Sequence, residues 1–78
     1  MYDRFLHHSI YALKYFSYSK ELSMCSDIVK SLLLLPKDLP ISQDTKKTCL
    51  KVLHLVPEPD KIEGFYDVVE LIASLKTR

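Results

Sequence analysis

Residues 32–42 read LLLLPKDLPIS, and this stretch decides the fold. The four leucines close a segment of helical period, which has to end before Pro36 because proline lacks the amide proton of a helix interior. Pro36 and Pro40 also disfavour helix at the residue before each of them. Residues 35–41 are therefore predicted to form a joint that turns the chain between two helices.

Working outward from this joint, hydrophobic periodicity predicts four helices, and no stretch shows the alternation of a strand. The predicted bounds are residues 3–17, Ser19 or Ser23 to Leu35, Ser42 or Asp44 to Val56, and Asp60 onward. Serine and aspartate mark helix starts because their side chains accept hydrogen bonds from the first free amides. Asp60 and Glu63 also have the spacing of a capping box, so the fourth helix is expected to begin at Asp60.

Each predicted helix has an apolar face that should line one core. The expected inward residues of the first three helices are Phe5, Leu6, Ile10, Leu13 and Phe16; Leu22, Cys25, Ile28, Val29, Leu32 and Leu33; then Thr45, Cys49, Val52, Leu53 and Val56. The fourth helix is apolar over more than half of its circumference, which predicts a central position. Within it would lie Gly64, the only glycine of the chain, where a neighbouring element is expected to approach closely.

These patterns predict an all-α fold. The expected architecture is a compact four-helix bundle, with a five-helix arrangement as the alternative, in which neighbouring helices run roughly antiparallel. The chain has 78 residues, which is the length of one domain, and that domain is expected to cover residues 1–78.

The composition argues against several function classes. A single glycine leaves no glycine-rich loop for a phosphate or a dinucleotide. A net charge of +1 gives no basic surface of the kind typical of nucleic-acid-binding domains. The sequence shows neither a signal peptide nor an apolar run long enough to span a membrane. An intracellular location is therefore expected, with Cys25 and Cys49 reduced.

The side chains that could support catalysis or bind metal do not form a recognisable pattern. The soft metal ligands of the chain are His7, His8, Cys25, Cys49 and His54, and their spacings fit no zinc motif. Cys49 and His54 would point about 140° apart on one helix, which prevents a nucleophile and base pair. The acidic residues of the fourth helix form a polar stripe rather than a buried pair. We therefore expect no enzymatic activity, no metal and no cofactor.

Two further groups of residues are candidates for binding a partner. Tyr11, Tyr15 and Tyr18 recur at i, i+4 and i+7 on the first helix, opposite its apolar face. They are packing residues if this helix is central; otherwise they form an exposed surface for a partner protein or a second copy, because tyrosine is enriched in interface hot spots. Lys46, Lys47 and Lys51 cluster on the third helix, either as a solvated face or as a weak phosphate-binding surface.

Several segments resemble the N-terminal domain of transcription elongation factor S-II, a family that includes similar domains in elongin A and Mediator and the integrase-binding domain of LEDGF. The resemblance covers about residues 22–76 and is carried by residues 27–35 (DIVKSLLLL), 39–42 (LPIS), 47–53 (KTCLKVL) and 69–76 (VELIASLK). The family typically has an LPIT-like turn, a KTV-like helix and a closing LI-x-x-W-K. In this chain the helix between the turn and the KT step is shorter, and Leu75 stands where tryptophan is typical.

This resemblance implies a non-enzymatic scaffold that docks short disordered motifs with acidic and aromatic residues, in nuclear complexes of transcription elongation. Carried over by position, the docking residues would be Leu39, Pro40, Ile41, Lys46, Lys47 and Thr48. The turn is then expected to be exposed and apolar beside the lysines. Two alternatives stay open: a structural module that self-associates through Tyr11, Tyr15 and Tyr18 without a peptide ligand, and a weak nucleic-acid binder.

Overall fold

The computed structural model describes residues 2–77, and these residues form an all-α bundle. The elements are α1 (Tyr2–Tyr18), α2 (Leu22–Leu33), α3 (Gln43–Leu53), a short 3-10 helix η1 (Pro59–Lys61) and α4 (Phe65–Ser74). Within the described range the only strand-like pairing is an isolated parallel bridge between Ile41 and Thr77. The predicted four-helix fold is confirmed, and η1 is a fifth, very short helical element.

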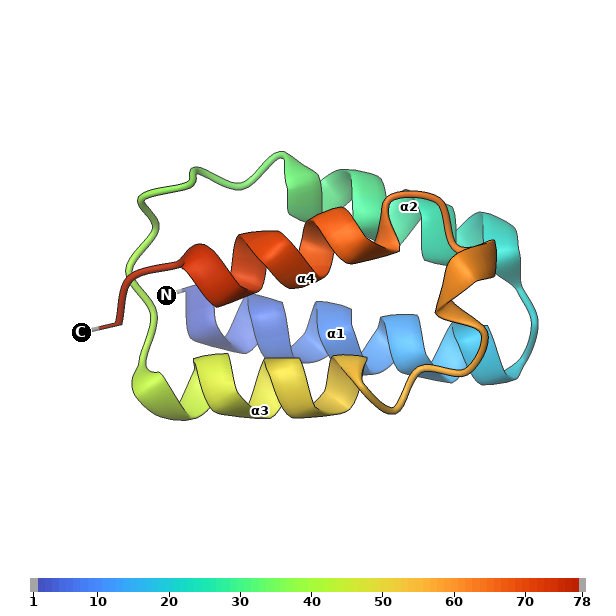
Figure 1. The fold of residues 1–78 in the computed structure, drawn as a ribbon, viewed down its shortest axis with the longest axis horizontal. Helices are drawn as coiled ribbons and strands as arrows, with labels where there is room; N and C mark the ends of the chain where they lie inside the picture. Colours follow the sequence, from blue (N-terminus) through green and yellow to red (C-terminus); the bar gives the residue numbers. More distant parts are fainter. Residues whose placement is uncertain (1, 78) are drawn as a thin grey trace.

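The four helices stand at the corners of a bundle. α1 lies against α2 and α3, and α4 packs against the same two helices. Successive helices run antiparallel, whereas α1 and α3 run in the same direction (Figure 1). The radius of gyration is 11.5 Å, which equals the value of about 11.5 Å expected for a compact domain of this length. The predicted central position of the fourth helix is wrong, because Tyr66 and Ala73 on its apolar side face solvent.

The core contains residues from all four helices and from the loops between them. The inward stripe predicted for α3 is confirmed, since its five members are buried: Thr45, Cys49, Val52, Leu53 and Val56. α1 buries Leu6, Ile10 and Leu13 as predicted, together with Ser17. The predictions of inward Phe5, Leu22 and Leu33 are wrong, because these three side chains are exposed.

The start of α3 was predicted correctly, and the start of α2 was not. The Ser42 side chain accepts a hydrogen bond from the Thr45 amide at 3.1 Å, which makes it the N-cap of α3. α2 begins after Glu21, whose side chain makes no capping bond. Neither predicted cap is used: the Ser19 hydroxyl donates to the carbonyl of Tyr15, and Ser23 lies inside the helix. α2 ends at Leu33 and α3 ends at Leu53, each a few residues before the predicted bound.

The predicted start of α4 at Asp60 is wrong. Residues 59–61 form η1, and α4 begins at Phe65 after Gly64, whose φ of +80° lies in the left-handed region. The Asp60 carboxylate accepts a hydrogen bond from the Tyr66 hydroxyl at 3.1 Å, which raises the pKa of Tyr66. Gly64 thus turns the chain into the helix and does not lie inside it. The close approach predicted at Gly64 is present, because a Cβ there would lie 3.0 Å from Val29 Cγ1.

The buried thiol of Cys49 predicts a pH dependence of stability. Burial raises the pKa of Cys49 from 9.0 to about 11, and the Asp3 carboxylate adds to the rise. Between these two values the unfolded chain has lost the thiol proton and the folded chain has kept it. The free energy of unfolding should therefore be unaffected by this group below pH 9 and fall as pH rises toward 11, by at most about 1.4 kcal/mol per pH unit.

Urea unfolding from about pH 8 to about pH 11, followed by circular dichroism, measures this effect. The control is Cys49→Ala, which lacks this thiol and keeps every other ionisable group of the chain. We expect the fall with pH to be shallower in the variant. If the free energy of unfolding fell equally steeply with pH in both proteins, burial would not raise the pKa of the Cys49 thiol.

Candidate functional site

The turn at residues 39–42 does not form the exposed apolar surface expected from the sequence. Leu39 is buried, Ile41 has no exposed surface, Pro40 is exposed and Ser42 is partly buried. The Ile41 amide donates to the Lys76 carbonyl at 3.0 Å, and the Ser42 amide donates to Asp3 Oδ1 at 3.0 Å. The turn is therefore hydrogen-bonded both to the start of α1 and to the segment that follows α4, which lie at the same end of the bundle (Figure 1). The predicted docking role of Leu39 and Ile41 requires exposure that these residues do not have.

The lysines after the turn have different environments. Lys46 Nζ donates a hydrogen bond to the Leu75 carbonyl at 2.9 Å. Leu75 is the C-cap of α4, so the ammonium lies at the negative end of that helix, where a cation is stabilising. Lys47 is exposed, and Thr48 is partly buried. Of these predicted docking residues, Lys46 links α3 to the end of α4 by a hydrogen bond, whereas Lys47 is exposed and accessible to a partner.

The three tyrosines of α1 are exposed, as the partner-binding interpretation requires. The exposed fractions are 50% for Tyr11, 65% for Tyr15 and 59% for Tyr18. The Tyr18 hydroxyl donates to the Leu55 carbonyl at 3.3 Å, and the Tyr15 ring packs edge-on against the ring of Phe16. The alternative, in which these tyrosines are core residues of a central helix, is wrong.

One stripe of α1 runs along α3. His7, Tyr11, Lys14 and Tyr18 are spaced i, i+4, i+7 and i+11, so they share one face of the helix. At one end His7 Nε2 lies 3.2 Å from Thr45 Oγ1, and at the other end Tyr18 bonds to Leu55. Tyr11 and Lys14 consequently lie between these two contacts, along the line where α1 meets α3.

Opposite this stripe, α3 and the residues that follow it contribute a second row of side chains, which runs parallel to the first because α1 and α3 have the same direction. Thr45, Thr48, Val52 and Leu55 are spaced i, i+3, i+7 and i+10, and the two bonded ends fix the register with α1. Thr48 is therefore opposite Tyr11. We call this surface the α1/α3 seam; it comprises Tyr11, Lys14, Tyr15 and Tyr18 of α1 with Lys47, Thr48, Lys51 and Leu55 of α3 and the residues that follow it.

Charge separates the bundle into two layers. α1 and α3 carry five basic and two acidic side chains, whereas α2 and α4 carry one basic and three acidic ones. α1 and α3 lie against each other, as do α2 and α4, so each pair forms one layer. Lys47 and Lys51 are exposed on the basic layer. The seam therefore combines aromatic rings with free positive charge.

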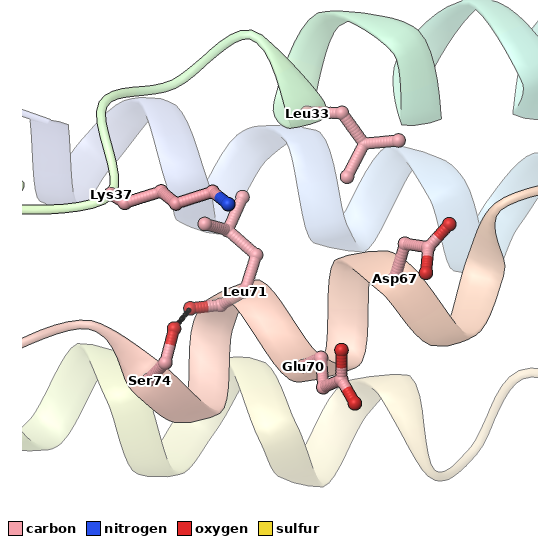
Figure 2. A pocket seen from close by; sticks show the side chains of 6 residues that line it. All are labelled: Leu33, Lys37, Asp67, Glu70, Leu71 and Ser74. Carbon is pink, nitrogen blue, oxygen red and sulfur yellow. Dashed lines mark hydrogen bonds between the residues drawn. The ribbon is translucent and has the colours of Figure 1, made fainter.

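A groove on the opposite layer was not predicted from the sequence. It is a hollow of about 510 Å³ between α2, the following loop and α4, lined by Leu33, Lys37, Asp67, Glu70, Leu71 and Ser74. Leu33 and Leu71 project into the space between the helices, with Asp67 toward one end and Lys37 toward the other (Figure 2). We call it the α2/α4 groove. The acidic stripe of the fourth helix was recognised in the sequence, but only the tertiary fold shows that it borders Leu33.

The described residues contain no cluster of three or more histidine, cysteine or acidic side chains that could hold a metal ion. Cys25 and Cys49 are free and buried, and burial raises the pKa of both thiols. A thiol whose pKa is raised is a poor nucleophile at neutral pH. Within residues 2–77 no helix combines the length and the apolar character needed to cross a membrane.

Comparison with known proteins adds no relative. No family model matches the chain, and neither a curated protein nor a solved structure matches it. The resemblance to the elongation factor S-II domain therefore stays a prediction from sequence.

Proposed function

We propose that this protein is a non-enzymatic interaction module whose α1/α3 seam binds acidic protein segments that carry aromatic or aliphatic side chains. The observation that carries the proposal is the exposure of three tyrosines on one face of α1, each at least half accessible, together with exposed Lys47 and Lys51 on α3, the helix that packs against α1. Exposed tyrosines provide a large apolar contact area at a small cost in side-chain entropy, which suits an interface.

The positive charge of the seam favours a partner that carries carboxylates. Arg4, Lys14, Lys47 and Lys51 belong to the basic layer and would attract carboxylates, with effects mainly on association rate and specificity. Apolar side chains of the partner would contact the tyrosine rings and Leu55. A disordered acidic segment with aromatic residues meets both requirements and can fold as it binds.

The resemblance to the elongation factor S-II domain supports the same class of partner by an independent route, and it adds a nuclear setting in transcription elongation to the proposal. The contact residues differ from those carried over by position. Leu39 and Ile41 are buried, so the proposed contacts come from α1 and the outer face of α3.

Substitution of Tyr15 provides the direct test. A short fluorescein-labelled peptide of aspartate, glutamate, phenylalanine and leucine is titrated with the protein, and binding is read as fluorescence anisotropy. We expect Tyr15→Ala to weaken binding about tenfold, as for a moderate interface hot spot. The matched control is Tyr66→Ala, because Tyr66 is exposed to a similar extent but lies on α4. This variant should bind like the unsubstituted chain.

Reversal of the lysine charges supplies a second readout. Lys47→Glu combined with Lys51→Glu should weaken the peptide further at low salt and reduce the salt dependence of binding. A single-stranded oligonucleotide is titrated in parallel. Equal peptide affinity for Tyr15→Ala, for the lysine variant and for the unsubstituted chain would contradict the proposal, as would tighter binding of the oligonucleotide than of the peptide.

A further inference from the structure

The α2/α4 groove has the chemistry that the proposed function assigns to a partner of the seam. Leu33 and Leu71 provide apolar surface within it, and Asp67 and Glu70 provide carboxylates along its border. Leu34, which directly follows Leu33 of the groove, is 86% exposed, more than any other large hydrophobic residue among residues 2–77. Lys37 lies at the other end of the groove from Asp67, so the part bordered by Asp67 and Glu70 is acidic and aliphatic (Figure 2). The same molecule thus carries a surface of this kind and the basic and aromatic one.

The two surfaces lie on opposite layers of the bundle. The seam belongs to α1 and α3, and the groove belongs to α2 and α4. One copy cannot bring its own seam and groove together, but two copies stacked layer on layer can. The net charge of only +1 also gives little overall repulsion between copies.

We infer that the chain associates head to tail, with the α1/α3 seam of one copy seated on the α2/α4 groove of the next. This inference rests on the proposed function, because it names a second copy as a partner of the seam. Lys47 and Lys51 of one copy face the carboxylates of Asp67 and Glu70 of the other. The tyrosine rings cover the exposed leucines, and Tyr15 is the most exposed of the three rings.

Such an interface is heterologous, since different patches meet on the two copies. It leaves one free seam and one free groove at the ends of every assembly, so growth does not stop at a dimer unless the stacking closes into a ring. A symmetric contact of tyrosine face on tyrosine face would instead stop at two copies. This difference separates the inference from simple dimerisation through the tyrosines.

Two variants each remove one half of the interface. The seam variant combines Lys47→Glu with Lys51→Glu, and the groove variant combines Asp67→Asn with Glu70→Lys. Asparagine at position 67 keeps a polar side chain in the first turn of α4. Circular dichroism and thermal unfolding confirm that both variants are folded before association is measured.

Sedimentation velocity is run at low salt over a concentration series from roughly micromolar to millimolar, the range of weak protein contacts. We expect the sedimentation coefficient of the unsubstituted chain to rise with concentration and to fall with added salt. Each variant alone should associate at least tenfold more weakly. An equimolar mixture of the two should form a 1:1 complex, because the groove of the seam variant and the seam of the groove variant are intact.

The inference is overturned if the groove variant associates as strongly as the unsubstituted chain, or if the mixture stays monomeric while the unsubstituted chain associates. It is also overturned if the unsubstituted chain is monomeric throughout the series. In that case binding of the acidic peptide to the seam decides separately whether the proposed function stands.

Discussion

Replacing Ile41 by aspartate should unfold the protein. Ile41 has no exposed surface and is part of the core, so the variant loses the contacts of a buried isoleucine, a loss of about 2–5 kcal/mol for truncation alone. It also places a carboxylate at a fully buried position, where the loss of hydration adds a further penalty. A domain of 78 residues has a total stability of roughly 4–12 kcal/mol. The sum of these losses is comparable with the whole stability.

Thermal unfolding followed by circular dichroism measures the effect, and two controls define its cause. Ile41→Val keeps the apolar contact and should cost only about 0.5–1.5 kcal/mol. Leu34→Asp makes the same kind of change at an exposed position nearby and should cost less than about 1 kcal/mol. If Ile41→Asp unfolded at the same temperature as the unsubstituted chain, the turn would be exposed, as the sequence alone had suggested.

Replacing Gly64 by alanine should destabilise the fold by about 2–4 kcal/mol. The φ of Gly64 is +80°, a backbone conformation that costs alanine about 1–2 kcal/mol. The new Cβ would also lie 3.0 Å from Val29 Cγ1 and 3.6 Å from Leu33 Cδ1. Val29 is buried in the core and cannot move aside freely, so crowding adds to the backbone strain.

A double-mutant cycle with Val29→Ala separates these two causes. Val29→Ala removes the crowded methyl groups but leaves the backbone strain, so the two substitutions together should cost less than the sum of their separate effects, by about 1 kcal/mol. Urea unfolding gives the four free energies. Additive effects would mean that strain at φ alone accounts for the cost, and an effect of Gly64→Ala within about 0.5 kcal/mol of zero would contradict both causes.

The hydrophobic periodicity of the sequence was sufficient to predict the buried residues of a helix where that helix buries only a narrow stripe. The inward face of α3 was predicted completely because its apolar residues are flanked by lysines, which leaves only one way to orient the helix. The Ser42 N-cap was predictable for a similar reason, since it directly follows the proline joint. On α4 the apolar residues extend around most of the helix, so periodicity could not show that Tyr66 faces solvent.

The errors occurred where distant residues decide the outcome. The turn at Ile41 is covered by the C-terminal segment, whose Lys76 carbonyl accepts its amide proton, and nothing in residues 39–42 indicates this partner. The spacing of Asp60 and Glu63 suggested a helix start, but the backbone at Gly64 redirects the chain before α4 begins.

Half of the candidate site followed from the sequence. The spacing of Tyr11, Tyr15 and Tyr18 placed them opposite the apolar face of their helix and left open whether another element covers them; the structure shows that they are exposed. Their alignment with Thr48 and Leu55 depends on the register between α1 and α3, which the contacts of His7 and Tyr18 fix. The α2/α4 groove requires α2 and α4 to be neighbours, and the order of helices along the chain does not determine this.

The central claim is that the α1/α3 seam is the binding surface, and amide chemical shifts in a two-dimensional NMR titration test it most directly. The acidic peptide is added to isotope-labelled protein at a concentration at which the protein is monomeric. We predict that the largest shift changes occur within residues 7–18 and 45–55, with small changes in α2 and α4. The largest changes within residues 33–41 or 67–74 would contradict the account.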